Sequence, residues 1–280
     1  MADCLTRGFP DAPPGYWTKA LRRMAARPPI SPYPRYGYAL EAEGKIVGAI
    51  LVIYSWRDAS EGGSVRCNLS SWCVDKEYRA YASTLHMMAV KFKEVTYLNI
   101  SPAEHTWPVI EAVGFSRYSD GQLFFAPLLS APQPSARARA FHPDDPASTL
   151  LSKSERQILT DHASLGCRAL ICVKAGAAIP FIFQDRAVLR QTISCPHLIY
   201  CRSLGELAAC ANSIGRYLLF RTGPFCVVDA NGPVDGLVGW RLKDRFPRYF
   251  NGPDPPRVGD LSYTELVLLG PSSGRSPSWT

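Results

Sequence analysis

The chain has 280 residues, which is enough for one large domain or for two domains of about 130 residues each. Hydrophobic residues make up 46% of it and charged residues 20%, so most of the chain is expected to fold. The net charge of +7 favours an anionic partner only weakly, because no zinc finger, helix-turn-helix or aromatic-studded basic strand accompanies it. We therefore expect no nucleic-acid binding.

The sequence also predicts where the protein resides. No apolar run approaches the roughly 18–20 residues that span a bilayer, and residues 1–14 lack the basic-then-apolar order of a secretory signal. Nine cysteines are scattered without any Cys-x-x-Cys pair, which favours reduced thiols over a disulfide framework or a zinc site. We expect a cytoplasmic protein with no membrane span and no metal. The oligomeric state stays open.

Hydrophobic periodicity predicts alternating helices and strands in the first half. A tight turn at Glu43 and Gly44 should join the first two strands, because glycine readily takes a positive φ. The expected helices are residues 16–26, 83–93 and 104–113, and the expected strands are residues 38–42, 46–54, 66–74, 95–101 and 123–128.

The second half follows a stretch rich in Pro, Ala, Ser and Arg that is typical of a linker. The expected helices there are residues 154–163 and 204–211, and the expected strands are residues 168–174, 179–184, 197–201, 217–221, 225–229 and 263–269. The predicted divisions are a first domain at 1–130, a linker at 131–147, a second domain at 148–270 and a disordered tail at 271–280.

The two halves share the order of their predicted elements and several local matches. The hairpin turns at Gly44 and Gly176 are 132 residues apart (176 minus 44). Residues 117–121 match residues 248–252 at three of five positions, as Arg-Tyr-Ser-Asp-Gly against Arg-Tyr-Phe-Asn-Gly. The sequence therefore predicts that the second half is a degenerate tandem repeat of the first.

Residues 74–84 form a strand–loop–helix segment that could bind an anion. Small residues in the loop would let backbone N–H groups approach a ligand, and the N-terminus of the following helix offers unsatisfied donors and the positive end of its dipole. Arg79 could add a charge-assisted contact to a phosphate. The same arrangement also occurs where no ligand binds, so it does not decide the function by itself.

Two motifs in the first half resemble the GNAT superfamily of acyl-CoA-dependent N-acyltransferases. Residues 74–82 resemble its pyrophosphate loop, whose pattern is Arg/Gln-x-x-Gly-x-Gly/Ala. Asn99 at the end of a strand, followed by Glu-Ala-Val-Gly-Phe at residues 111–115, resembles a later motif of that family. The resemblance covers residues 16–130. It implies an α/β protein of two GNAT-like lobes, each with a mixed, mostly antiparallel sheet flanked by helices.

The resemblance also implies a reaction, in which an amine attacks the thioester of acetyl-CoA or another acyl-CoA directly. In this family a bulged strand supplies a backbone N–H that stabilises the oxyanion; the corresponding strand here is residues 69–74, with Ser71 as a candidate catalytic residue. The acceptor would be a small-molecule or peptide amine. The residues expected at the cofactor are Trp72, Cys73, Val74, Arg79, Ala80, Tyr81, Ala82, Ser83, Thr84 and Asn99.

This sequence departs from the family's pattern in two places. Ala82 stands where the family usually carries glycine, and Thr84 where it carries glycine or alanine. Ile110 stands where many members carry a tyrosine that protonates the departing thiolate. His105 and Tyr118 are the candidates that could act as the missing acid or base, since histidine titrates near neutrality. His105 is equally compatible with a solvent-facing loop residue, and Tyr118 with a structural role.

Cys73 and Trp72 each have a second interpretation. Cys73 could act as a nucleophile, but no histidine is paired with it locally and buried structural cysteines are commoner. Trp72 could form a wall of the acyl pocket or simply belong to the core.

The second half lacks the phosphate-binding loop. Residues 200–203 pass almost directly from a strand to the helix that begins at Leu204. We therefore expect this half to bind no coenzyme A and to serve as a structural or acceptor-binding lobe, with Asp229, Asp235 and Asp244 as possible contacts for a cationic acceptor. The alternative function for the whole chain is an inactive protein that binds or senses acyl-CoA.

Overall fold

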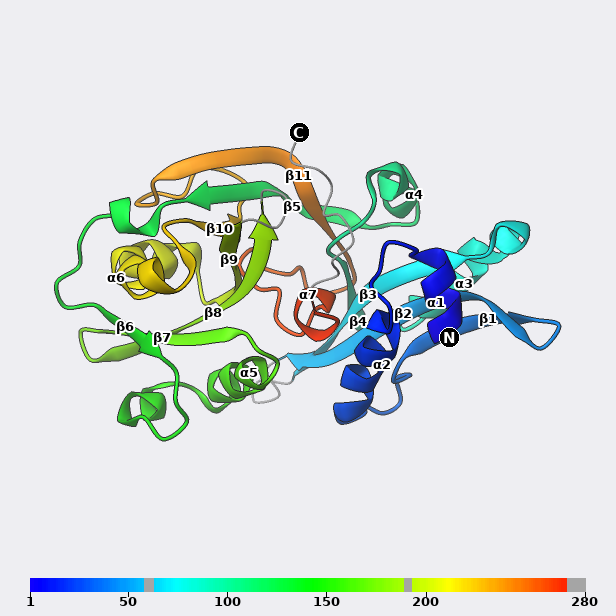
Figure 1. The fold of residues 1–280 in the computed structure, drawn as a ribbon, viewed down its shortest axis with the longest axis horizontal. Helices are drawn as coiled ribbons and strands as arrows, with labels where there is room; N and C mark the ends of the chain where they lie inside the picture. Colours follow the sequence, from blue (N-terminus) through cyan, green and yellow to red (C-terminus); the bar gives the residue numbers. More distant parts are fainter. Residues whose placement is uncertain (58–62, 189–192, 271–280) are drawn as a thin grey trace. The chain divides into compact units, whose positions relative to one another are not determined.

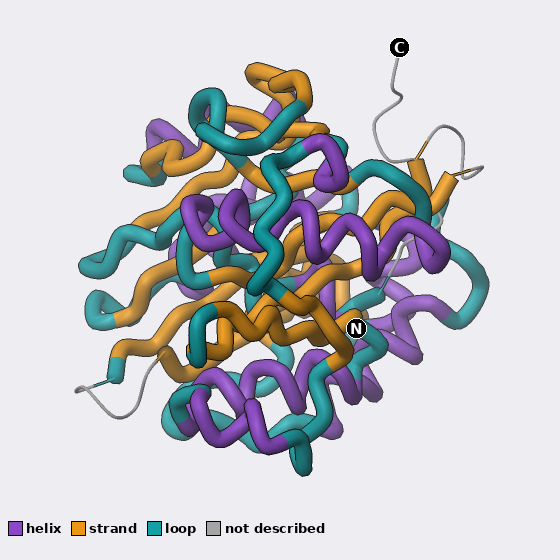
Figure 2. The backbone as a smooth tube through the Cα atoms, turned by 90° about the vertical axis from the view of Figure 1, so that its left-hand side faces the viewer, coloured by secondary structure: helices purple, strands orange, loops and turns teal. Residues whose placement is uncertain are grey.

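The computed structural model describes residues 1–57, 63–188 and 193–270 (Figure 1). The chain has an α/β fold built on mixed, mostly antiparallel sheet, as predicted; the described pairings include only two parallel ones, β3 with β4 and β9 with β10. The alternation of strands and helices along the backbone can be followed in Figure 2. The predicted tail at 271–280 lies outside the described residues.

The chain divides into two compact units, and segments of the two units alternate along the sequence. Unit 1 comprises residues 1–116, 248–255 and 263–280, and unit 2 comprises residues 117–247 and 256–262. This division differs from the predicted boundaries, because the chain returns to unit 1 twice after residue 247. Residues 131–147, predicted as a linker, contain strand β6 (Arg137–Ala140) and belong to unit 2.

The sheet of unit 1 has the strand order β1-β2-β3-β4, followed by the last residues of β11. Strand β2 is an interior strand, and its apolar run is buried over nearly its whole length. The strands are β1 (Gly37–Ala42), β2 (Lys45–Arg57), β3 (Ser64–Val74), β4 (Val95–Asn99) and β11 (Gly239–Asn251). The α-helices are α1 (Ala2–Gly8), α2 (Tyr16–Ala26), α3 (Ala82–Ala89), α4 (Trp107–Ala112) and α7 (Glu265–Leu268).

The core of unit 1 forms where helices α3 and α4 cover one face of this sheet. Leu85 and Ala89 of α3 and Ile110 of α4 pack against Val52 and Leu69, all of them buried. Each buried Leu, Ile or Val side chain contributes about 1.5–3 kcal/mol when it leaves water, so this face holds the strands of the site in place.

Unit 2 repeats several local features of unit 1. Its strand order is β5-β10-β9-β8-β7-β6, with the first part of β11 beside β5. The turns of the two hairpins match, because Glu43 and Gly44 have φ of 52° and 74° while Ala175 and Gly176 have φ of 48° and 79°. The elements are β5 (Ser116–Phe125), α5 (Lys153–Ser164), β7 (Arg168–Lys174), β8 (Ala177–Val188), β9 (Ile193–Cys201), α6 (Leu204–Thr222) and β10 (Cys226–Asp229).

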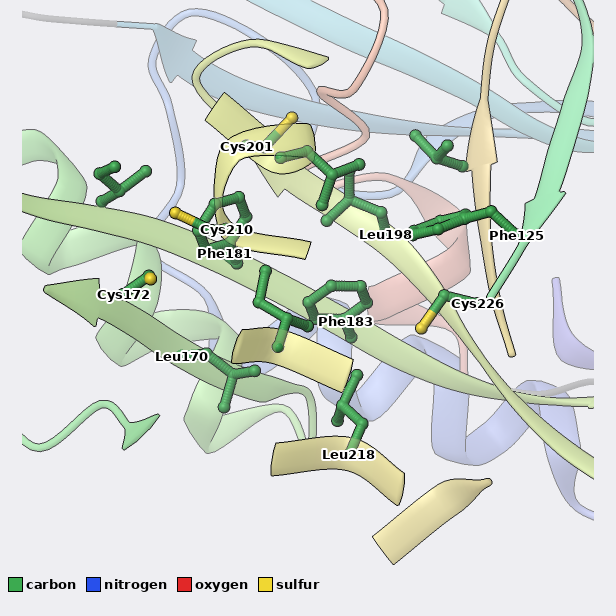
Figure 3. Close-up of a cluster of buried hydrophobic side chains, with 14 of the residues drawn as sticks. Phe125, Leu170, Cys172, Phe181, Phe183, Leu198, Cys201, Cys210, Leu218 and Cys226 are labelled. Carbon is green, nitrogen blue, oxygen red and sulfur yellow. The ribbon is translucent and has the colours of Figure 1, made fainter. Parts of the chain in front are cut away.

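The core of unit 2 lies between its sheet and helix α6. Phe181 and Phe183 of β8 pack there with Cys210 and Leu218 of α6, and all four are buried (Figure 3). Leu218 lies in a segment predicted as a strand at 217–221, and that prediction is wrong. The helical spacing of apolar residues that starts at Leu204 continues through Leu218, so α6 runs on to Thr222.

Three further predictions differ from the structure. The segment 263–269, predicted as a strand, contains the short helix α7. The strand predicted at 123–128 begins earlier, at Ser116. The long strand β11 was not predicted at all, because Arg, Lys and Asp interrupt its apolar pattern.

Candidate active site

Strands β3 and β4 separate at a point that we call the β3–β4 fork. They pair in parallel over residues 65–68 and 95–98, with Asn68 opposite Leu98 at the last position. Beyond it, no strand among the described residues pairs with residues 69–74 on that side. The backbone of β3 therefore presents an unpaired edge, and such an edge offers hydrogen-bonding groups to an extended ligand.

A β-bulge lies in the same stretch of β3, where this strand pairs with β2. Cys73 pairs with Ala49 and Ser70 with Leu51, so β3 carries one residue more than its partner β2. Ser71 has a φ of 52°, in the left-handed region that serine rarely occupies. A bulge of this kind re-aims the backbone N–H groups next to it. The bulge falls on the strand where the family resemblance predicted one.

Asn68 fixes the C-terminal helix α7 at the β3–β4 fork. Its Oδ1 accepts a hydrogen bond from the backbone N–H of Glu265 at 2.6 Å, and its Nδ2 donates to the carbonyl of Leu69 at 2.8 Å. The side chain of Asn68 is buried, so these bonds form away from water. Figure 1 shows α7 in red beside β3 and β4. Glu265 therefore lies at the fork although it is 197 residues away in sequence (265 minus 68).

The carboxylate of Glu265 lies among polar groups of unit 1. Oε1 accepts a hydrogen bond from Ser101 Oγ just beyond β4. The hydroxyl of Ser70, next to the bulge, also bonds to the carboxylate, and Arg248 adds a nearby positive charge. Burial nevertheless raises the pKa of Glu265 above its ordinary value, against the opposing effect of these three groups. Sequence reasoning missed this residue.

The side chains of the predicted cofactor residues of β3 lie in different surroundings. The Trp72 indole packs 5.3 Å from the ring of His86 in α3, and its Nε1 is buried with no hydrogen-bond partner among the described residues. Cys73 lies 4.0 Å from Cys4 of α1, measured between the sulfur atoms. Burial raises the pKa of Cys73 to about 12, which keeps the thiol protonated at neutral pH. Val74 is half-buried at the end of β3.

The predicted phosphate loop is a short 3-10 helix, η2 (Lys76–Tyr81), that leads directly into α3. The N–H of Ala82 donates to the carbonyl of Arg79 and is therefore used internally. No side chain caps the N-terminus of α3. The side chains of Arg79, Ala80, Tyr81, Ser83 and Thr84 are exposed, and that of Ala82 is half-buried.

The predicted acid–base candidates, His105 and Tyr118, lie in different units of the chain. His105 is exposed on a single 3-10 turn, and no contact among the described residues joins it to Glu265 or to the bulge. Tyr118 lies in β5 of unit 2. Ile110, at the position of the family's tyrosine, is buried in the core. Asn99 ends β4, half-buried and opposite Tyr249 of β11.

Unit 2 has a fork of the same kind, but its own chain covers the edge. Strand β9 pairs in parallel with β10 at His197, and a register shift follows. The N–H of Cys201 donates to the carbonyl of Gly259 at 3.0 Å, and the N–H of Leu261 donates to the carbonyl of Ile199 at 2.7 Å. The segment 259–261 therefore occupies the edge of β9 that is unpaired on β3.

The sequence also made predictions about the loop before α6 and about three aspartates of unit 2. Only two residues separate the end of β9 from the start of helix α6, so the long loop of unit 1 has no counterpart, as the sequence predicted. Asp229 is buried, where it accepts a hydrogen bond from Gln122 at 2.8 Å and lies 3.4 Å from His197. Asp235 is exposed, and Asp244 forms an exposed ion pair with Arg117.

Within the described ranges, no group of three or more His, Cys, Asp or Glu side chains is placed to hold a metal ion. Among the helices that the structure describes, none has the length and apolar composition needed to cross a membrane.

No family model matches the sequence, and no curated protein matches it significantly. Solved structures do match the fold. A GCN5-related N-acetyltransferase from Anabaena variabilis matches with a TM-score of 0.56 at 7% identity, over 89% of this chain and 69% of that one. A probable N-acyltransferase from Enterococcus faecalis matches with a TM-score of 0.54 at 11% identity, over 93% and 70%. The chain has the GNAT fold.

A third structure extends this comparison. A putative acetyltransferase from Pyrococcus horikoshii matches with a TM-score of 0.53 at 11% identity, over 94% of this chain and 89% of that one. The chain spans less than two thirds of two other matched chains, at 66% and 32% of their length. At these identities the likeness establishes the fold and leaves the activity to be argued from the site.

Proposed function

We propose that unit 1 transfers an acyl group from an acyl-CoA to an amine. The observation that carries this proposal is the unpaired, bulged edge of β3 at the fork, with the carboxylate of Glu265 beside it. An extended chain with amide groups, such as the pantetheine arm of coenzyme A, can add to such an edge as a further strand would.

The geometry supplies what an acyl transfer needs. Backbone N–H groups at the bulge around Ser71 would stabilise the oxyanion that forms when the thioester carbonyl is attacked. The exposed first turn of α3 and Arg79 would hold the phosphates. The thiol leaving group has a reference pKa of about 8.5, so it can depart without the tyrosine that Ile110 replaces. Most of the rate would come from holding amine and thioester together.

We propose that unit 2 binds no acyl-CoA and that it arose as a repeat of unit 1. The matching hairpin turns and the two forks support a common origin. The segment 259–261 already uses the edge of β9, and no phosphate loop precedes α6. A structural lobe or an acceptor-binding lobe remains its proposed role.

A protein that only binds or senses acyl-CoA is the second candidate function. The internal hydrogen bonding of η2 and the burial of Ile110 favour it, because both weaken the family's usual machinery. The placement of the Glu265 carboxylate at the fork favours catalysis, because a proton acceptor there could deprotonate a reacting amine.

Calorimetry with acetyl-CoA and a longer acyl-CoA tests the proposal. We expect one binding site per chain, and we expect the charge reversal Arg79→Glu to abolish or strongly weaken binding. Arg22→Glu is the matched control, because Arg22 is an exposed residue of the same unit in α2. Release of free thiol with a panel of amines then separates an enzyme from a sensor.

The outcomes divide cleanly. No binding by the intact protein at high concentration would contradict both candidate functions. Equal weakening by Arg79→Glu and Arg22→Glu would show that binding follows net charge and not the proposed loop. Binding without thiol release with any amine would leave the sensor.

A further inference from the structure

Glu265 is placed at the fork by bonds on both its backbone and its side chain. Its N–H is held by the buried Asn68, and its carboxylate accepts from Ser101 and bonds to Ser70. Ser70 Oγ lies 2.9 Å from Ser71 Oγ, so one hydrogen-bonded chain joins the carboxylate to the bulge. The residue as a whole is half-buried.

We propose that Glu265 is a catalytic residue of the acyl transfer, which accepts a proton from the ammonium group of the acceptor. This inference rests on the function proposed above. It commits the acceptor to an amine that is protonated in solution, such as a primary alkylamine, because a carboxylate attracts a cation and gains nothing from an uncharged nucleophile.

The proposed reaction is a proton transfer followed by direct attack on the thioester. The ammonium group gives one proton to the Glu265 carboxylate, and the neutral amine attacks the thioester carbonyl carbon, so that a C–N bond forms. The C–S bond then breaks, the thiolate takes a second proton from nitrogen, and the amide keeps the third. Glu265 returns its proton to solvent. No oxidant or further co-reactant is needed.

Charged and titratable groups around Glu265 are compatible with this role. Arg248 of β11 is buried and donates to the carbonyl of Ile100, so its charge is held near the carboxylate. The charge of Glu265 also acts on Tyr16 of α2. Burial, and then this charge, raise the pKa of Tyr16 to about 12. Tyr16 is thus a neutral phenol at working pH, and the carboxylate is the group that can take a proton.

A structural role for Glu265 would be an ion pair with Arg248 that merely holds α7. Glu265→Gln separates the two roles, because the amide keeps the size and the ability to accept from Ser101 but cannot take a proton. Glu41→Gln is the matched control, since Glu41 is exposed on β1 of the same unit.

The experiment compares the two variants with the wild type on two acceptors at pH 7, one alkylamine that is protonated there and one hydrazide that is already neutral. For Glu265→Gln we expect acetyl-CoA binding within about twofold of wild type. We expect kcat/KM to fall about 100-fold or more with the alkylamine and less than about tenfold with the hydrazide. The acidic limb of the pH–rate profile should also disappear.

The results discriminate between the possible failures. Wild-type rates in Glu265→Gln, or equal losses with both acceptors, would overturn the role of Glu265 and leave the acyl transfer standing. Absence of binding and turnover in the wild type would overturn the proposed function itself, and this inference with it.

Discussion

Asn68 and Glu265 are joined by a 2.6 Å hydrogen bond between a buried side-chain oxygen and a backbone N–H. Asn68→Ala would leave that N–H, and the carbonyl of Leu69, without their partner. A buried polar group that loses its partner costs about 1–3 kcal/mol, so we expect the free energy of unfolding to fall by that amount. Urea unfolding measures the loss, and hydrogen exchange at the amide of Glu265 should speed up.

Asn99→Ala is the control for this variant. Asn99 is a half-buried asparagine of the same unit with no side-chain hydrogen bond among the described residues, so its loss should stay below about 0.5 kcal/mol. Similar losses for both variants would show that Asn68 does not hold α7.

The bulge at Ser71 gives a second prediction. A β-branched side chain fits poorly at a φ of 52°, so Ser71→Val should lower the free energy of unfolding by about 1–2 kcal/mol, while Ser71→Gly should change it little. Glu43→Val has the same φ of 52° but lies in a hairpin turn, so it should lose stability similarly and leave acyl-CoA binding intact. Circular dichroism and calorimetry measure the two effects. Unimpaired binding by Ser71→Val would argue against the bulge as part of the site.

How far the sequence predicted the site depends on the distance between its parts. The strand 66–74 and the helix after it follow from local patterns, because each is decided by residues within about a turn or a strand of one another. The bulge was expected only from the family resemblance. Glu265 could not be found from local patterns, since tertiary contacts, with its bond to Asn68 among them, bring it to the fork. The pair Thr264 and Glu265 before an apolar run was the available signal, because it is typical of a helix start.

The strand β11 and the return of the chain to unit 1 after residue 247 were missed for the same reason, because both depend on contacts between distant residues. β11 has Lys243, Asp244 and Arg245 in its middle, so no alternating pattern marks it in the sequence. Its pairing with β4 at Tyr249 joins residues about 150 positions apart (249 minus 99), which no local periodicity contains.

His86 makes stability depend on pH. Burial lowers its pKa below the ordinary 6.5, so folded His86 stays neutral where the unfolded chain would be protonated. The unfolded state then binds more protons, and the free energy of unfolding falls as pH drops through about 6.5, by about 1.4 kcal/mol for each unit by which folding lowers the pKa. His86→Phe should reduce this fall between pH 7 and pH 5.

Phe115→Leu provides the comparison for His86. Phe115 packs 5.9 Å from the His86 ring but carries no titratable group, so its substitution should cost the same stability at both pH values. Unfolding curves at pH 7 and pH 5 check both variants. An unchanged slope in His86→Phe would contradict the assignment.

Cys73 should be chemically inert in the folded protein. Because burial raises its pKa to about 12, little thiolate exists at pH 8, and the thiolate is the reactive form. Maleimide labelling followed by peptide mass mapping should leave Cys73 unmodified, while the same protein in urea should label at all nine cysteines. Cys73→Ala should retain acyl transfer within about twofold. An acyl group found on Cys73 would point to a covalent intermediate in place of direct attack.

The return of residues 248–255 and 263–270 to unit 1 has a consequence for the order of synthesis. The ribosome completes residues 1–116 long before it makes β11 and α7, and until then the edge of β4 has no partner. An exposed strand edge invites pairing with other chains, so a nascent chain at this stage is at risk of aggregation. Neither half of the sequence contains a complete unit. Translation must pass residue 268 before the first-made part of the chain acquires Glu265 and its last strand.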